Sequence, residues 1–183
     1  MTKKRITALS NIIALENVRN EERKSEAIPG VHPACDKWIV TDGIAAVVLS
    51  EKPEGLQEAE ELQSVYKLVE QEINRTDKLL AYTATQDKIK EWKALAKLWK
   101  QGKDHKTGAT PVEITVHTDD GYTLTGYYNP WFLVNVVEAV GPNALIYIGR
   151  GGRFSNFPTL FVYPKDWMER DPDTIGFLLP IRM

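Results

Sequence analysis

Apolar and polar residues follow the clearest pattern in the last third of the chain. They alternate over residues 112–117 and again over 122–128, which predicts two strands. Between these runs, Asp119-Asp120-Gly121 is typical of a tight turn in which glycine supplies the positive φ. Further short apolar runs predict strands at 144–148, 159–163 and 175–179.

A short helix is predicted between the paired strands and the later ones, over Trp131–Val140. Asn129 can cap its free amides and Pro130 suits its first position, while Gly141-Pro142 ends it. Only Asn135 and Glu138 interrupt its apolar surface. A strand pair, a buried helix and three more strands predict an antiparallel sheet with a helix packed on one face, which is an α+β fold.

The first fifty residues contain a second set of elements. Residues 6–24 have apolar positions at helical spacing, and Pro29-Gly30 forms a break after them. Trp38–Val40 and Ile44–Leu49 then predict a hairpin around Thr41-Asp42-Gly43. The two ends of the chain are therefore expected to fold against each other as matching sheet-and-helix halves.

The middle of the chain, at about 53–108, has a different pattern. Apolar residues recur at helical spacing over 62–73 and again over 89–99, with polar Asn74–Asp77 between the two runs. This pattern predicts an antiparallel helix pair inserted between the two halves.

Short sequence motifs near both ends of the chain resemble those of the repeating half-domain of the bacterial DNA polymerase sliding clamp (the β-clamp). That family has an F-N-x-x-Y-L helix start and a closing M-P-x-R tail, and Tyr128–Leu133 and Leu179–Arg182 correspond to them here. Thr41-Asp42-Gly43 corresponds to the family's T-D-G-x-R-L, although Ile44–Ala46 replace the residues that usually follow Gly. The resemblance implies one clamp-like domain over 1–183 that carries the helical insertion.

The resemblance also implies a peptide-binding pocket. In sliding clamps a hydrophobic pocket accepts short linear motifs of polymerases and other clients, and an apolar groove with polar edges suits such a ligand. The corresponding residues here are Thr41, Gly43, Phe177, Leu178, Leu179, Pro180, Ile181 and Arg182. The alternative is that Leu178 and Leu179 only finish the last strand in the core.

Lys90, Lys93, Lys97 and Lys100 fall within about a quarter of the helix circumference, opposite the apolar side chains. Such a stripe can contact DNA phosphates. The alternative is a solvated face, or one paired with the acidic helix before it. Arg150 and Arg153 lie in a glycine-rich connection between strands, from which a clamp-like protein would touch the DNA backbone.

Composition changes this picture little. The net charge of −2 gives no overall basic field, although a ring can have an acidic outer face and a basic inner face. The single cysteine, Cys35, fits a reducing cytoplasm, and no apolar run reaches the length of a membrane span. His32, His105 and His117 have no zinc-site spacing, and we expect no metal, cofactor or catalytic constellation.

The leading hypothesis is a non-enzymatic, clamp-like factor of DNA replication or repair that acts through protein contacts and encircles DNA as a ring of several copies. Its implied partners are double-stranded DNA, linear-motif peptides of replication proteins and further copies of the chain. The alternative is a peptide-binding adaptor or clamp mimic that does not bind DNA. An enzyme is the third hypothesis.

Overall fold

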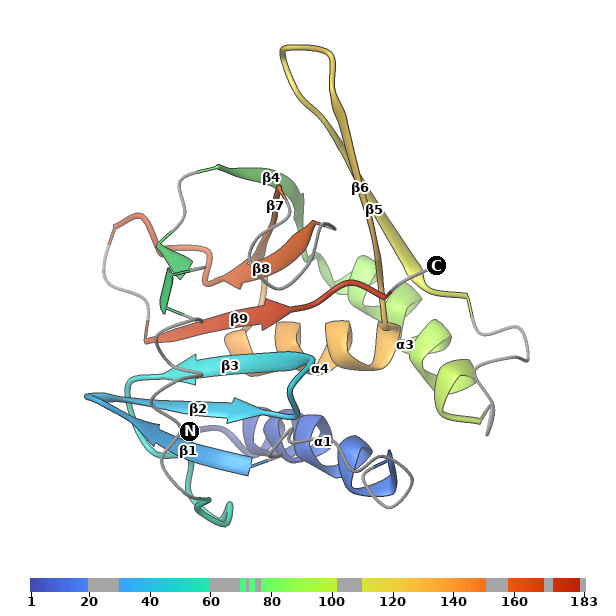
Figure 1. Cartoon of the computed structure of the whole chain (residues 1–183). Helices are drawn as coiled ribbons and strands as arrows, with labels where there is room; N and C mark the ends of the chain where they lie inside the picture. Colours follow the sequence, from blue (N-terminus) through green and yellow to red (C-terminus); the bar gives the residue numbers. More distant parts are fainter. Residues whose placement is uncertain are drawn as a thin grey trace.

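The computed structural model describes residues 1–19, 30–59, 70–71, 73–74, 77–101, 110–150, 158–169 and 173–181. In chain order its elements are α1 (Lys3–Arg19), β1 (Gly30–Ala34), β2 (Lys37–Thr41), β3 (Ala45–Leu49), β4 (Lys78–Thr83), α3 (Gln86–Gln101), β5 (Val112–His117), β6 (Thr123–Tyr128), α4 (Pro130–Val140), β7 (Leu145–Gly149), β8 (Thr159–Tyr163) and β9 (Thr174–Leu178). Seven of the strands form one sheet, and β5 and β6 form a separate two-stranded ribbon (Figure 1).

The two ends of the chain meet in the middle of the seven-stranded sheet. Its strand order is β1-β2-β3-β9-β8-β7-β4, and all neighbouring strands are antiparallel. Strand β3 from the N-terminal part pairs with β9 from the C-terminal part, with Ala45 opposite Leu178 and Leu49 opposite Thr174. The predicted α+β class and the antiparallel contact between the two ends are confirmed.

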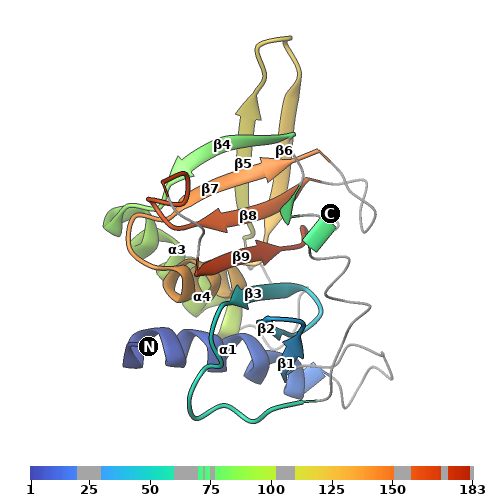
Figure 2. The same cartoon turned by 90° about the vertical axis from the view of Figure 1, so that its left-hand side faces the viewer.

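The three helices lie on one face of this sheet. Helix α4 contacts α1 on one side and α3 on the other, and it packs on β3, β8 and β9 (Figures 1 and 2). Side chains of all three helices join those of the sheet in one apolar core, to which Leu9, Trp92 and Phe132 contribute large buried groups. Burial of these apolar side chains between the helices and the sheet stabilises the fold.

Helix α4 begins and ends where its sequence predicts. The Asn129 side chain accepts a hydrogen bond from Trp131 N at 2.9 Å, Pro130 occupies the first turn, and Gly141 N donates to Val137 O at 2.9 Å. Most of its residues are buried, which fits a helix that is apolar nearly all round.

The opposite face of the sheet has its own apolar cluster. It contains Phe161, Tyr163 and Phe177, with Tyr147 and Trp167 packed against them. The rings of Tyr147 and Trp167 meet edge to face at 5.9 Å, an arrangement that aromatic pairs favour. Both faces of the central strands are therefore buried among the described residues.

The β5–β6 ribbon projects beyond the rest of the molecule (Figures 1 and 2). Its register places Val112 opposite Tyr128 and His117 opposite Thr123, as expected for the predicted hairpin. At its base Ile114 and Tyr128 are buried, and the Tyr128 hydroxyl donates to Pro158 O at 2.8 Å. The ribbon is anchored at its base and exposed at its turn.

The middle region differs from its prediction. The second predicted helix is present as α3, whereas most of the first one falls on residues outside the described part. Between them the chain forms β4, which was not predicted and which pairs with β7 at the edge of the main sheet. The insertion expected at about 53–108 therefore contributes a strand to the sheet and a helix to the helical layer, because a short apolar run such as Leu79–Tyr82 fits strand and helix equally well.

The N-terminal part contains a further strand that was not predicted. Strand β1 begins at Gly30, within the predicted break, and pairs with β2, with Val31 opposite Val40. It contains Pro33, which an edge strand tolerates because one side of its backbone needs no partner. Helix α1 also begins earlier than predicted, at Lys3, and it is described only to Arg19.

Candidate functional site

The predicted lysine face lies on α3, and its lysines have different surroundings. Lys90, Lys93 and Lys97 are exposed, while Trp92 and Ala96 on the other side of the helix are buried. The side chain of Lys100 lies outside the described residues. The predicted division of α3 into a charged face and a buried face is therefore confirmed for the lysines that the structure describes.

Two of these lysines form ion pairs with acidic side chains. Lys90 Nζ lies 3.0 Å from Asp87 Oδ1 on the same helix, and Lys93 Nζ lies 2.6 Å from Glu138 Oε1 on α4. By contrast, Lys97 has no acidic side chain within ion-pair distance in the described part of the chain. The alternative of internally paired lysines applies to two of them, although the acids come from α3 and α4 rather than from a preceding acidic helix.

Glu138 is the electrostatic centre of the helical layer. Its side chain is only 11% exposed, and Oε1 also lies 3.2 Å from Lys4 Nζ on α1. One carboxylate on the central helix therefore contacts a lysine from each neighbouring helix. This arrangement links the three helices electrostatically, since removing the carboxylate would leave two lysines close together without a counter-charge.

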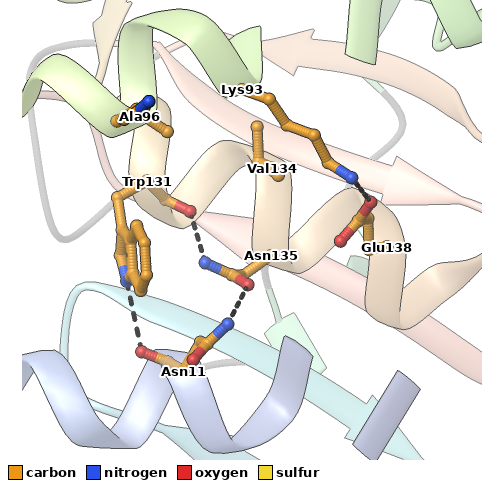
Figure 3. A pocket seen from close by; sticks show the side chains of 8 residues that line it. Asn11, Lys93, Ala96, Trp131, Val134, Asn135 and Glu138 are labelled. Carbon is orange, nitrogen blue, oxygen red and sulfur yellow. Dashed lines mark hydrogen bonds and ion pairs between the residues drawn. The ribbon is translucent and has the colours of Figure 1, made fainter. Parts of the chain in front are cut away.

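The three helices line a cavity of about 310 Å³ that is open to solvent and that the sequence did not reveal (Figure 3). Its lining residues are Asn11, Lys93, Ala96, Lys97, Trp131, Val134, Asn135 and Glu138. The one available signal was the pair of polar residues, Asn135 and Glu138, in an otherwise apolar helix. Both of them line this cavity.

Hydrogen bonds between α1 and α4 form the polar side of the cavity. Trp131 Nε1 donates to Asn11 O at 3.2 Å, and Asn11 Nδ2 donates to Asn135 Oδ1 at 3.0 Å (Figure 3). Asn135 Nδ2 in turn donates to Trp131 O at 2.8 Å. Asn135 is only 3% exposed, so its polar atoms need these partners.

The Thr41-Asp42-Gly43 turn uses its polar groups locally. Thr41 Oγ1 donates to Ala45 O at 2.8 Å and accepts from Gly43 N at 3.0 Å. Asp42 Oδ1 accepts from the backbone N–H groups of Ile44 and Ala45, at 2.9 and 2.7 Å. Thr41 and Asp42 are buried, whereas Gly43, with φ 90°, is exposed. The turn is a tightly bonded connection that leaves its glycine at the surface.

The C-terminal residues divide into buried and surface groups. Phe177 and Leu178 are buried on opposite faces of the sheet, so these two belong to the core. Leu179, Pro180 and Ile181 are partly exposed, and Arg182 lies outside the described residues. For Leu178, the alternative interpretation of the tail as the end of a core strand is confirmed.

The turn and the tail, which come from opposite ends of the sequence, lie side by side. Leu179 N donates to Ile44 O at 2.9 Å, which extends the β3–β9 ladder to the edge of the turn. Ile181 N donates to Tyr127 O at 2.7 Å and thereby attaches the tail to the ribbon. The structure therefore brings Gly43 close to the partly exposed tail residues, which form an apolar surface held by backbone hydrogen bonds.

Arg150 belongs to a different surface from the α3 lysines. Its guanidinium lies 3.5 Å from Asp120 Oδ2 and 5.6 Å from the ring of Tyr122, at the turn of the ribbon. A hydrogen bond from Thr118 and the charge of Arg150 lower the pKa of Asp120 below its ordinary value. The other predicted arginine, Arg153, lies outside the described residues. Arg150 thus contacts the ribbon, and Lys93 contacts α4.

Within the described part of the chain, no three His, Cys, Asp or Glu side chains lie close enough together to hold a metal ion. His32 is buried in β1, whereas Cys35 in the turn after it is exposed. None of the helices there is long and apolar enough to cross a membrane.

Comparison with known proteins does not assign the chain to a family. No protein-family model matches the chain, and a search of curated proteins found no match.

Proposed function

We propose that this chain is a non-enzymatic, sliding-clamp-like factor of DNA replication or repair that docks short peptide motifs of other proteins. The observation that carries the proposal is the hydrogen bond of 2.9 Å from Leu179 N to Ile44 O. It joins the C-terminal tail to the Thr41-Asp42-Gly43 turn. In the family that the sequence resembles, the corresponding two segments line the peptide pocket.

The chemistry of this surface suits a short apolar peptide. Leu179, Pro180 and Ile181 present apolar groups at a half-exposed position, and Phe177 behind them is fixed in the core. A surface with a rigid base loses little conformational entropy on binding, which favours affinity. Polar backbone groups of the neighbouring turn can orient the ligand.

The docking proposal is tested with a fluorescent peptide that carries a hydrophobic clamp-binding motif of a replicative polymerase. Replacing Ile181 by Asp puts a charge on the apolar surface and keeps the backbone hydrogen bond to Tyr127. We expect the dissociation constant to rise by about tenfold or more, because losing an apolar anchor at an interface typically has that effect.

The matched control is Leu98→Asp. Leu98 is 60% exposed on α3, away from the tail, and this variant should bind the peptide as the unchanged protein does. Equal peptide affinity of Ile181→Asp and Leu98→Asp, with both proteins folded, contradicts the docking proposal.

The DNA part of the proposal depends on the helical layer. Three helices cover one face of the sheet, and Lys97 presents a positive charge there without an acidic neighbour among the described residues. A chain with one such domain can encircle DNA only as several copies. The edge strand β4 is a place where a copy can add to the sheet, whereas the outer side of β1 is partly covered by Glu58 and Ala59, whose backbone bonds to Val31.

Two measurements test this part. The mass in solution distinguishes a ring former from a monomer, and duplex DNA binding is followed at several salt concentrations. If Lys97 contacts a phosphate, Lys97→Ala lowers the slope of log affinity against log salt by about one, whereas Lys165→Ala, in the exposed turn after β8, leaves it unchanged. A monomer that does not bind DNA refutes encirclement.

One observation favours the alternative of an adaptor that does not bind DNA. Asp87 and Glu138 already neutralise Lys90 and Lys93, which leaves little of the lysine face for phosphates. An adaptor predicts a protein that binds the polymerase peptide normally, stays monomeric and shows no affinity for duplex DNA even at low salt.

A further inference from the structure

We propose that the cavity between α1, α3 and α4 binds a nucleoside monophosphate, either free or as one unit of a single strand. The proposal does not rest on the clamp-like role, because the cavity, its hydrogen bonds and its charges are present whatever the chain assembles with. It concerns a ligand site inside the helical layer, and the peptide surface at the tail is separate from it.

The size and walls of the cavity suit one planar ring system. A volume of about 310 Å³ is at the lower end of the range for small-molecule sites, which excludes large cofactors and is far more than an inorganic ion needs. Trp131, Val134 and Ala96 provide the apolar part of the lining, and an indole is the side chain on which a base stacks most readily. Lys93 and Lys97 are exposed, so the cavity reaches the surface.

Unused amide groups give the cavity both donors and an acceptor. Each asparagine amide carries two N–H groups, and in the described structure Asn11 and Asn135 each use one of them, toward Asn135 Oδ1 and Trp131 O (Figure 3). One N–H of each amide and Asn11 Oδ1 remain for a ligand. Neighbouring donors and an acceptor on a rigid wall match the edge of a nucleobase.

The charges at the cavity favour an anion. Two lysines, Lys93 and Lys97, and one carboxylate, Glu138, line the cavity. Glu138 is already compensated by Lys93 at 2.6 Å and by Lys4 on α1 at 3.2 Å, so the charge of Lys97 is left over. Lys97 is the member with no acidic partner in the described residues, and its ammonium is a suitable point charge for a phosphate. The same cavity therefore offers a ring site and a phosphate site next to each other.

Isothermal titration calorimetry with AMP tests the proposal, and Lys97→Glu is compared with Lys90→Glu. Lys90 lies two turns earlier on α3 and outside the cavity lining. Lys90→Glu therefore makes the same change in net charge as Lys97→Glu without altering the cavity. We expect AMP affinity to fall by about tenfold or more in Lys97→Glu, because a charge-assisted hydrogen bond is lost, and to stay unchanged in Lys90→Glu. Equal affinities of the two variants, or no heat of binding at millimolar AMP, overturn the proposal.

Adenosine, ribose 5-phosphate and inorganic phosphate check both halves of the site without altering the protein. Adenosine and ribose 5-phosphate should each bind more weakly than AMP, because one lacks the phosphate and the other lacks the ring. Inorganic phosphate that binds as tightly as AMP overturns the ring site, and adenosine that does so overturns the phosphate site. An oligo(dA) strand that displaces AMP identifies a single strand as the source of the nucleotide, and failure to displace it identifies the free nucleotide.

Discussion

Gly176 lies at a point in β9 where helix α4 comes too close for a side chain. A Cβ built there would lie 2.3 Å from Val136 Cγ1, 3.2 Å from Val140 Cγ2 and 3.0 Å from Val162 Cβ. Two of these neighbours belong to α4 and the third to β8, and all of them are buried. The substitution Gly176→Ala therefore tests how tightly the helical layer packs on the central strands.

Two opposing effects set the size of the expected change. Overpacking a close-packed core costs about 1–3 kcal/mol, because neighbouring side chains must leave their preferred rotamers. Replacing glycine outside the positive-φ region restricts the unfolded chain and returns about 0.4–1 kcal/mol. We expect a net loss of about 1–2 kcal/mol in the free energy of unfolding.

Urea unfolding followed by tryptophan fluorescence measures this loss as a lower midpoint with an unchanged slope. A double-mutant cycle with Val136→Ala isolates the cause, because that change removes the methyl group that lies 2.3 Å from the built Cβ. On the Val136→Ala background, Gly176→Ala should be nearly neutral or stabilising. A midpoint at or above that of the unchanged protein, or an equal loss in both backgrounds, refutes the packing argument.

Three further predictions concern polar groups. Glu138→Gln should lower the free energy of unfolding by about 1 kcal/mol in urea titrations, since the paired Lys93 is half-exposed and solvent screens part of the loss. Asp42→Ala should lower it by about 2–3 kcal/mol in the same assay, because two backbone N–H groups lose one charged acceptor. NMR titration should show the Asp120 carboxyl with a pKa below its ordinary value, and Thr118→Val should raise that pKa. Because the folded-state pKa is lowered, any stabilisation from Asp120 is present at neutral pH and is lost as the pH falls through that pKa.

Much of the fold could be predicted because its elements carry strong local signals. Strong turn and capping signals such as Asn129-Pro130 and Gly141 place helix α4, and Asp119-Asp120-Gly121 marks the turn of the ribbon. Strands β1 and β4 were missed because neither has such signals. One contains Pro33, and the apolar run of the other fits both a helix and a strand. Both are edge strands, where tertiary pairing rather than local pattern decides the structure.

The candidate site could be predicted only in part, because a sequence pattern gives the type and spacing of side chains but not which side chains from other elements lie next to them. The stripe from Lys90 to Lys97 follows from helical spacing alone. The packing of α3 beside α4 decides which lysine finds a partner. Lys93 meets Glu138, whereas Lys97 meets no acidic side chain of the described residues. The cavity was likewise invisible, since it needs Asn11 from α1 next to Asn135 from α4.

Charged side chains of the helical layer take part both in helix packing and in the surface potential. Helix α3 comes from the middle of the chain and packs beside α4, and the ion pair that joins them, Lys93 with Glu138, removes a charge from the face that would meet DNA. The packing of α3 and the positive potential of its outer face therefore compete for Lys93. Lys90 pairs only within α3, and Lys97 has no acidic partner among the described residues. Substituting Lys97 therefore tests the proposed phosphate recognition, by a duplex or by a nucleotide in the cavity, without breaking an ion pair between the helices.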